Sequence, residues 1–427
     1  MAIKHYKWLE GNDPPPIQQH SIAKHEVLRE YLIAYIQTLA VLPARTELRL
    51  TLVDAFSGGG RYRHKDTGIE ILGSPFVFLT AIKEAEFILK KHPHRHKPFN
   101  LDVSYIFLDK DKEAIKYLKN LLVERGFSDL LHSQKITLLN NQFNQEIATI
   151  INSIKNKSPR SGRSIFLLDQ YGYKDVPTSH IRNILEKLPN SEIILTFATD
   201  ALINFISEKP ESQKILTELG IPSLLDGLSL SNVKHHKQWR LFIQSRLHQE
   251  LVNQCGAKFF TTFFIRSPNG FGDYWLVHLS QHPKARDVMT EIHWKLQNHF
   301  VHFGDAGLDM FQILGYNPKK DNDFAGQDIL PFEFDDIAQD RSVSTLMSQI
   351  PRLINQCDDV IRFGELFNST CNYSPASSSI YKSTVIKLQD EKDLEILTCK
   401  GGKRRSADCI ENSDIIRLPR QRAIYLG

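Results

Sequence analysis

Apolar residues in the N-terminal half of the chain alternate between short runs and longer segments with helical spacing. The short runs predict strands at Leu48–Val53, Val103–Leu108, Lys135–Leu139, Ser164–Leu168 and Glu192–Phe197. The longer segments repeat apolar residues every three or four positions, which predicts helices at 21–42, 76–89, 110–126, 145–154 and 179–188. Strands that alternate with helices in this way predict a parallel sheet with helices on both faces.

The pattern changes after the fifth predicted strand. Residues 200–257 have the pattern of a helical insertion, and strands at 258–266 and 273–280 follow, joined by a turn with Pro, Asn and Gly. Such turn residues are typical of an antiparallel hairpin, and a helix at 284–299 comes next. Five parallel strands followed by a hairpin resemble the strand set of the methyltransferases that use S-adenosylmethionine (SAM). The predicted fold is therefore α/β, class I methyltransferase-like (Rossmann-like), with a seven-stranded sheet.

The two ends of the chain differ from this α/β domain. Residues 1–20 contain GNDPPPIQQ and predict an irregular N-terminal arm, followed by the methyltransferase-like domain at 21–300 and a linker at 301–335. Residues 336–427 predict two or three helices and then EKDLEILTCKGGKRRSADCI, in which two short strands flank a basic Gly-Gly turn. Helices followed by a basic hairpin are the outline of a winged helix.

Composition and charge exclude several classes of protein. With 41% hydrophobic and 24% charged residues, the chain has the composition of an ordinary globular protein. The net charge of +4 is too small to indicate nucleic acid by itself. The five cysteines form no CxxC pair, so we expect reduced thiols and no metal. No run of apolar residues is long enough to span a membrane, and we expect a cytoplasmic protein.

Candidate chemistry begins where the first predicted strand ends, in DAFSGGG. Ligands of open parallel sheets bind at the carboxyl ends of the strands, and glycine lets a backbone approach a ligand closely. We expect Asp54 to hold this loop or to bind the methionine amino group of SAM. The predicted cofactor-binding residues of the loop are Asp54, Phe56, Gly58 and Gly60. The alternative is a structural turn that binds nothing.

The next two strand ends add polar residues to this predicted cofactor site. Asp109 stands where an acid can accept hydrogen bonds from both ribose hydroxyls, and Asn141 stands where a polar residue can face the adenine amino group. About 50 residues separate Gly58 from Asp109, against roughly 20 in the dinucleotide fingerprint, because the loop Arg61–Leu72 and a long helix intervene. This spacing favours SAM over NAD. A simple surface or helix-capping role for Asp109 and a structural role for Asn141 are the alternatives.

The fourth predicted strand ends in LLDQYGYKDVP. Amino-methyltransferases carry Asp/Asn-Pro-Pro-aromatic here: the acid accepts a hydrogen bond from the target amine, and the aromatic ring stacks on the base. An enzyme of this kind must draw the base out of its stack. Asp169 with Tyr171 or Tyr173 fits this catalytic pattern in part, although Gln170 stands where proline is expected. Alternatively, Asp169 caps the next helix or contacts only the cofactor.

Several basic residues are further candidates. Lys24 and His25 lie at the start of the first predicted helix, where a cation can face the methionine carboxylate. Arg61 follows the glycines and could contact a substrate phosphate. The predicted nucleic-acid-binding residues of the C-terminal domain are Lys382, Lys400, Lys403, Arg404 and Arg405. Basic side chains of this kind position a protein on phosphates. The alternatives are solvated surface residues and a winged helix that binds protein.

These segments together resemble the three-Cys-motif partner (TcmP) family. The resemblance rests on KHEVLREYL, VDAFSGGGRY, GSP, FLDKD, LLDQYGY and KRRSADCIENSDIIRLPRQR, and it covers about residues 20–427. It implies a class I methyltransferase-like fold with a winged-helix nucleic-acid binder. The chain is more distantly similar to bacterial enzymes that methylate adenine N6 in ribosomal RNA, whose N-terminal Lys/His segment maps onto Lys24 and His25. Ser57, Gly59 and Gln170 depart from the usual TcmP pattern.

Two functions of different class follow from these features. The first is a SAM-dependent methyltransferase that acts on a nucleic-acid base in DNA or RNA, with an adenine amino group as the target. The second is a non-methylating component of a phage-defence or mobile-element complex, which binds SAM or a nucleotide and works through a protein partner encoded nearby. Both need the pocket at the strand ends. The methyltransferase alone needs Asp169 and its aromatic neighbours.

Overall fold

The computed structural model describes residues 6–17, 19–41, 45–91, 99–170, 174–207, 209–230, 239–265, 274–296, 301–302, 306–308, 332–333 and 335–419. The chain forms two compact units, Met1–Ile292 and His293–Gly427. No helix among the described residues is long and apolar enough to cross a membrane.

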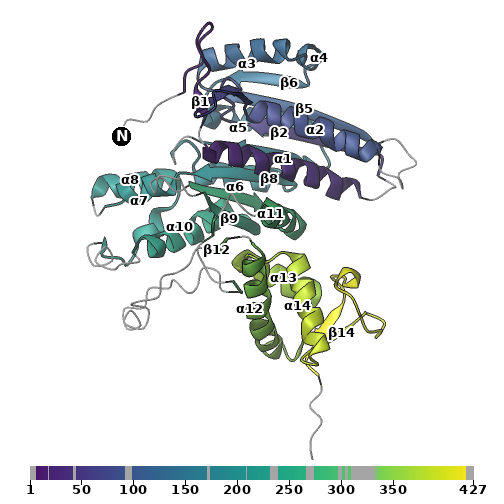
Figure 1. Ribbon diagram of the computed structural model, residues 1–427. Helices are drawn as coiled ribbons and strands as arrows, with labels where there is room; N and C mark the ends of the chain where they lie inside the picture. Colours follow the sequence, from purple (N-terminus) through teal and green to yellow (C-terminus); the bar gives the residue numbers. More distant parts are fainter. Residues whose placement is uncertain are drawn as a thin grey trace, which may run out of the picture. The chain divides into compact units, whose positions relative to one another are not determined.

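Seven strands of the first unit form its central sheet (Figure 1), in the order β9, β10, β8, β7, β2, β5, β6. Its strands are β2 (Glu47–Asp54), β5 (Asn100–Asp109), β6 (Ile136–Asn140), β7 (Ser164–Leu168), β8 (Ser191–Phe197), β9 (Phe259–Ile265) and β10 (Tyr274–Ser280). Strands β6, β5, β2, β7 and β8 pair in parallel, whereas β10 runs antiparallel to both β8 and β9. The predicted parallel strands and terminal hairpin are confirmed, and the fold is class I methyltransferase-like.

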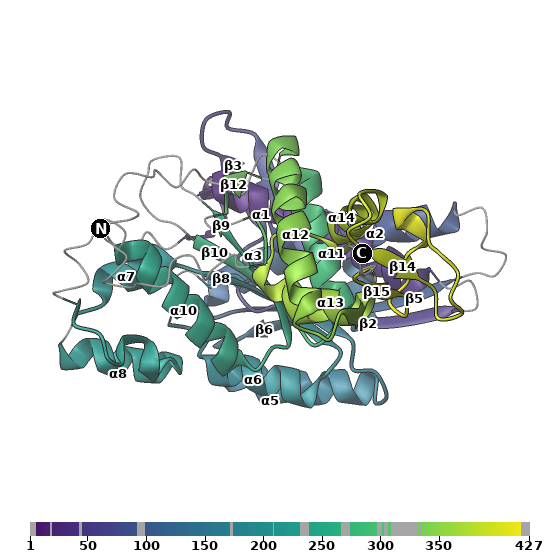
Figure 2. The ribbon, with the colours of Figure 1, turned by 90° about the horizontal axis from the view of Figure 1, so that it is seen from below.

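Helices cover both faces of this sheet (Figure 2). Helices α1 (Gln19–Ala40) and α2 (Ser74–Lys90) lie on one face, and α5 (Phe143–Lys157), α6 (Thr178–Lys187) and α10 (Trp239–Cys255) follow the other. The other helices among the described residues up to Leu296 are α3 (Lys112–Glu124), α4 (Ser128–His132), α7 (Thr199–Phe205), α8 (Pro210–Leu219), the short 3-10 helix η1 (Pro222–Leu225) and α11 (Pro283–Leu296). Every residue of β7 and β8 is buried, as expected for parallel strands between two helical layers. The predicted helical insertion between β8 and β9 is confirmed.

The direction of the chain switches between β2 and β7. Strand β2 pairs with β5 on one side and with β7 on the other, so that Asp54 lies level with Phe107 and Leu167. Asp109 comes two residues after Phe107, and Asp169 comes two residues after Leu167. The carboxyl ends of these three strands therefore bring Asp54, Asp109 and Asp169 to one edge of the sheet, where open α/β sheets bind their ligands.

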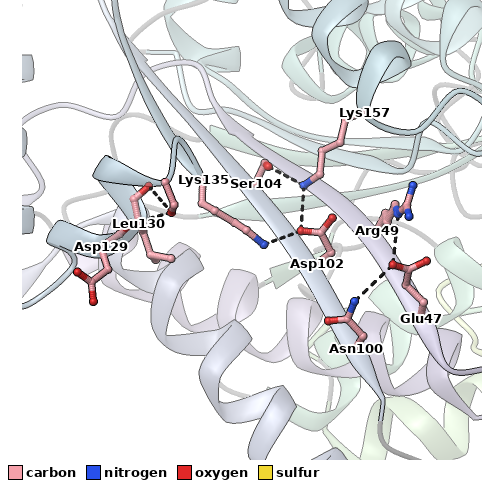
Figure 3. A network of polar contacts seen from close by, with 10 residues as sticks. Glu47, Arg49, Asn100, Asp102, Ser104, Asp129, Leu130, Lys135 and Lys157 are labelled. Atoms are coloured by element: carbon pink, nitrogen blue, oxygen red, sulfur yellow. Dashed lines mark hydrogen bonds and ion pairs between the residues drawn. The ribbon is translucent and has the colours of Figure 1, made fainter.

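The amino ends of β2 and β5, opposite the carboxyl ends, carry a network of ion pairs and hydrogen bonds (Figure 3). Lys135 Nζ lies 2.6 Å from Asp102 Oδ1, and Lys157 Nζ lies 2.5 Å from Ser104 Oγ and 3.7 Å from the same Asp102 oxygen. Burial alone would raise the pKa of Asp102, but the hydrogen bond from Lys135 and the charge of Lys157 outweigh it and lower that pKa. These charges satisfy one another, so the network has a structural role.

Two segments next to the glycine loop are more regular than the sequence predicts. The predicted loop Arg61–Leu72 contains β3 (Arg61–His64) and β4 (Glu70–Leu72), which pair antiparallel. The arm, expected to be irregular, adds β1 (Pro16–Ile17) in parallel to β3. Strand β3 is Arg-Tyr-Arg-His, and β1 and β4 have only two and three residues, so no apolar run marks these strands. Strand β1 forms by pairing with a segment that is distant in sequence.

The second unit contains a winged helix. The described elements of this unit are β11 (Val301–His302), β12 (Phe332–Glu333), α12 (Asp336–Asn355), β13 (Val360–Arg362), α13 (Phe363–Thr370), η2 (Cys371–Tyr373), α14 (Ser378–Asp390), β14 (Glu395–Leu397), η3 (Ala407–Cys409) and β15 (Ile415–Arg417). The winged helix begins at α12. Strands β13, β15 and β14 form an antiparallel sheet in that order. This arrangement confirms the predicted winged-helix-like domain.

One strand pairing in this domain differs from the sequence prediction. The Gly-Gly turn forms as expected, since Thr398 N donates to Gly402 O at 2.7 Å. Across this turn, a single antiparallel β-bridge joins Leu397 to Lys403. The three-residue partner of β14 is β15, further along the chain. Arg404 pairs with Asp414 across this wing segment, at 2.7 and 3.0 Å. No turn or strand signal in the sequence predicts this ion pair.

Candidate active site

The loop after β2 turns toward the end of β5. Ser57 N donates to Leu108 O at 2.9 Å, and Gly58 N donates to Asp109 Oδ2 at 3.0 Å. Gly58 and Gly60 have φ values of +56° and +75°, the left-handed region that favours glycine. Phe56 lies at the same place, with its ring centroid 6.4 Å from that of Phe143 at the start of α5. The loop is thus fixed to β5, and its apolar residue reaches α5.

Asp54 is a fully buried carboxyl group at the base of this loop. Its Oδ1 accepts a hydrogen bond from Phe56 N at 3.2 Å. Burial raises the pKa of Asp54 to about 7, which the Ser74 hydroxyl and the Phe56 amide oppose and the charges of Asp169 and Asp109 reinforce. The Ser74 hydroxyl is close enough to lower this pKa, yet Oδ2 accepts no hydrogen bond of normal geometry from the described residues. Such a group can change its charge when a cation binds.

Asp109 lies half-buried at the end of β5. Its two oxygens accept hydrogen bonds from Gly58 N at 3.0 Å and Asp111 N at 2.8 Å. Burial raises its pKa, although these two amides oppose the shift. The N-cap of α3 is Asp111, whose side chain accepts from Glu113 N. Asp109 therefore does not cap α3, and its remaining lone pairs suit the hydroxyl groups of a ribose.

Asn141 forms its hydrogen bonds locally. Its Nδ2 donates to Glu146 Oε1 at 2.7 Å, and its Oδ1 accepts from Gln142 N at 2.9 Å. The neighbouring Asn140 donates to the carbonyl oxygens of Asp109 and Lys110, both at 3.1 Å. The two asparagines thus hold the ends of β5 and α5 together. Contact between Asn141 and an adenine remains a prediction.

Lys24 and Asp169 form an ion pair between α1 and the end of β7. Lys24 Nζ lies 2.5 and 2.8 Å from the two carboxylate oxygens of Asp169. The two side chains are 11% and 27% exposed, so the carboxylate remains accessible. Burial alone would raise the pKa of Asp169, but the charge and hydrogen bond of Lys24 outweigh it and lower that pKa. The structure thus pairs Lys24 with the predicted catalytic residue, whereas the sequence predicted a contact with the cofactor.

His25 lies beside this ion pair and is uncharged at neutral pH. Burial is the largest cause, followed by the charge of Lys24, and together they lower the pKa of His25 to about 4 against the opposing charge of Asp169. A neutral imidazole can donate or accept a hydrogen bond but adds no positive charge. His25 therefore leaves the negative charge of the site unchanged.

Gln170 holds the loop that follows Asp169. Its side chain is buried, and Oε1 accepts hydrogen bonds from Asp175 N at 3.1 Å and Val176 N at 3.3 Å. The residue that precedes α6 is Pro177, so Asp169 is not the N-cap of that helix. Tyr171 and Tyr173 lie outside the described residues. Gln170 thus replaces the expected proline with a side chain that closes the same loop through hydrogen bonds.

The predicted phosphate-binding residues have unequal surroundings. Arg61 is 18% exposed and pairs with Glu70 at 2.9 Å and Glu124 at 2.5 Å. Arg404 is paired with the buried Asp414 and stabilises the wing. Lys382 is half-buried on α14, with Nζ 5.9 Å from the centroid of the Phe363 ring. The remaining three, Lys400, Lys403 and Arg405, are exposed. They are the predicted residues best placed for phosphate contacts.

The site residues fit a cationic nucleoside such as SAM. Asp54, Asp109 and Asp169 lie at adjoining strand ends, and Lys24 is the partner cation of Asp169. The buried Asp54 oxygen without a regular hydrogen bond suits an ammonium group. Among the described residues, no group of His, Cys, Asp and Glu could hold a metal ion. The sequence analysis missed Trp8, an aromatic residue in the polar arm, which packs on the glycine loop.

Comparisons with known proteins found distant similarities in structure and one family match. No curated protein matches the chain. EvdMO1 is 12% identical over 61% of this chain with a TM-score of 0.28, and the chain spans only 42% of its length. An rRNA methylase from Streptococcus thermophilus is 13% identical over 62% of this chain and 99% of its own, with a TM-score of 0.27.

A third structure is the plantazolicin methyltransferase BamL in complex with a triazolic desmethylPZN analog and SAH. It is 8% identical over 60% of this chain and 85% of its own, with a TM-score of 0.24. All three similarities are too distant to indicate a substrate. Residues 315–401 match the family model of the GMT-like wHTH domain.

Proposed function

We propose that this protein is a SAM-dependent methyltransferase that acts on an amino group of a nucleic-acid base, most simply adenine N6, and that it is related to the TcmP family. The observation that carries this proposal is the accessible carboxylate of Asp169, held by Lys24 at the same sheet edge as Asp54 and Asp109. The GMT-like wHTH match supports nucleic acid as the substrate. The proposed setting is the cytoplasm.

Each residue of the site has a separate task in this proposal. Asp54 binds the methionine ammonium and Asp109 the ribose hydroxyls, while SAM, when bound, supplies a methyl group activated by its sulfonium. Asp169 accepts a hydrogen bond from the target amine and turns the nitrogen lone pair toward that methyl group. Lys24 keeps Asp169 ionised, because it lowers the pKa of that carboxyl. Transfer to an activated methyl group needs positioning more than a strong base.

Binding and transfer test the proposal in two steps. Calorimetric titration of the whole chain with SAM should give a micromolar dissociation constant, roughly −8 kcal/mol. Labelled SAM should then transfer its methyl group to single-stranded or duplex DNA or RNA, and digestion should recover the label as N6-methyladenosine or its deoxy form. Label on a ring carbon, or no label on any nucleic acid that the protein binds, would contradict the amino-group assignment.

SAM affinity is expected to increase with pH. Burial raises the pKa of Asp54 to about 7, so the carboxyl is protonated below this pH and negatively charged above it. The charged form binds an ammonium better, and affinity should rise about tenfold between roughly pH 6 and pH 8. Titrations at several pH values check this. Asp54→Asn removes the titrating group, and the same pH dependence in this variant would show that SAM itself is responsible.

The exposed residues of the wing are expected to bind phosphates. Replacing Lys400, Lys403 and Arg405 with alanine should weaken binding to all sequences alike. It should also reduce the slope of log K against log salt by about 2 to 3, because each phosphate contact contributes roughly 0.9. Fluorescence anisotropy over a salt series measures this slope. The matched control replaces the exposed Arg341 and Arg352 of α12; an equal change per charge removed would argue against a specific wing contact.

A second function is favoured by one observation. Gln170 stands in place of proline, and Lys24 bonds to both oxygens of Asp169, so that Asp169 needs no further partner. A non-methylating protein of a phage-defence or mobile-element complex, which binds SAM and acts through a protein partner, would keep this arrangement. Strong SAM binding without transfer to any DNA or RNA would support this second function.

A further inference from the structure

The N-terminal arm places an indole ring directly on the glycine loop. Trp8 is 6% exposed, and its Nε1 donates to Arg61 O at 2.8 Å. A Cβ built on Gly58 would lie 2.6 Å from Trp8 Cη2, and one built on Gly59 would overlap Cγ and Cδ1 of the same ring. A side chain at either glycine would therefore displace the indole. The glycines admit a close neighbour, and the neighbour in this structure is the chain's own tryptophan.

At Gly59, the contact with Trp8 is by itself sufficient to require a glycine. Gly58 and Gly60 have positive φ values, but Gly59 does not. The backbone at Gly59 is therefore open to any residue, and only the space taken by Trp8 excludes a side chain. An alanine at this position tests the contact without backbone strain.

The arm is anchored on both sides of Trp8. Glu10 accepts hydrogen bonds from Asn120 at 2.6 Å and Lys116 at 3.2 Å, both on α3. Asp13 pairs with Arg63 at 2.6 Å, and β1 adds to β3 shortly after. Displacing Trp8 would have to break or bend these contacts. A fixed wall agrees with them better than a plug that leaves whenever a ligand enters.

The aromatic cluster around Trp8 borders the acidic site. Tyr62 packs edge-on against Trp8 and Tyr6, with centroid distances of 5.5 and 5.6 Å. Burial raises the pKa of Tyr62 well above its ordinary value, and the charges of Asp169, Asp54 and Asp109 add to this shift. The backbone amide of Gly58, on which the Trp8 ring packs, also donates to Asp109, the predicted ribose acceptor. The indole and the acidic groups therefore face the same small region.

We infer that the arm, residues 6–17, is a built part of the cofactor pocket, and that Trp8 forms the apolar wall for the nucleoside end of the ligand. This inference rests on the proposed binding of SAM. Flat aromatic surfaces favour nucleobases by stacking or edge contact. The wall also keeps water from the glycine loop, where the ribose hydrogen bonds form.

Titration of the full chain and five variants with SAM tests this inference. Trp8→Ala and Gly59→Ala should each weaken SAM binding about tenfold, Trp8→Phe should weaken it less, and the exposed arm neighbour Leu9→Ala should bind like the wild type. The double variant Trp8→Ala/Gly59→Ala should bind no more weakly than Trp8→Ala, because the alanine methyl group then meets no indole. Thermal unfolding of each variant shows whether it folds.

The outcomes separate this inference from the proposed function. If the wild type binds SAM and Trp8→Ala binds it equally well or more tightly, the wall is wrong, whereas the methyltransferase proposal stands. Fully additive losses of SAM affinity in the double variant would also contradict the role of Trp8 as a wall. If the folded wild type binds no SAM, both the proposed function and the role of Trp8 fail together.

Discussion

Replacing Asp169 with alanine is expected to abolish methyl transfer while leaving SAM affinity within about twofold of the wild type. Asp169 would orient the target amine, and a positioned group of this kind contributes on the order of 10²–10⁴-fold to the rate. The cofactor contacts assigned to Asp54 and Asp109 do not pass through it. Single-turnover transfer from labelled SAM to a nucleic acid, with parallel calorimetry, measures both quantities.

Asp175→Ala is the matched control for this experiment. Asp175 is an exposed acid of the same loop, and it contacts Gln170 through its backbone amide, which alanine retains. This control should transfer at the wild-type rate. Equal transfer by Asp169→Ala and the wild type would refute the catalytic assignment. A large loss of SAM affinity in Asp169→Ala would show that Asp169 contacts the cofactor rather than the target amine.

Replacing Asp109 with alanine is expected to weaken SAM binding by about 3 kcal/mol, which is on the order of a hundredfold. Two ribose hydroxyls would lose a charged acceptor, and Gly58 N would lose the oxygen that fixes it at 3.0 Å. Both effects act in the same direction, because the glycine loop and the ribose share this carboxylate. Calorimetric titration with SAM measures the loss.

Asp111→Ala provides the control for Asp109. It removes a carboxylate two residues away that caps α3 and accepts no hydrogen bond from the glycine loop. Its cost should appear in thermal stability, at about 1 kcal/mol, with SAM affinity unchanged. If Asp109→Ala binds SAM as well as Asp111→Ala does, the ribose site lies elsewhere and the glycine loop serves the scaffold alone.

The sequence predicted the sheet because the information for it is local. Strand β7 coincides with the predicted Ser164–Leu168, and β2, β5, β6 and β8 differ from their predictions by a few residues at one or both ends. Parallel strands buried between helical layers need continuous apolar runs, and such runs are visible without knowledge of their neighbours. The segment between β9 and β10 carried its own signal in Pro, Asn and Gly, although these residues lie outside the described part of the chain.

The sequence also placed the acids of the site at the sheet edge, because a residue that directly follows a strand must lie at its carboxyl end. The strand order then brought Asp54, Asp109 and Asp169 together. The partner of each acid could not be read in this way. Lys24 is 145 positions from Asp169, and only the packing of α1 against the sheet makes them an ion pair.

The sequence by itself therefore determined the alternation of strands and helices, the terminal hairpin, the winged-helix outline and the strand ends that carry acids. Only the tertiary structure decided that Lys24 pairs with Asp169 and that Trp8 covers Gly58 and Gly59. The physical reason is range. Periodicity and turn chemistry act between near neighbours, whereas ion pairs and close packing join residues whose distance in space has no counterpart in the sequence.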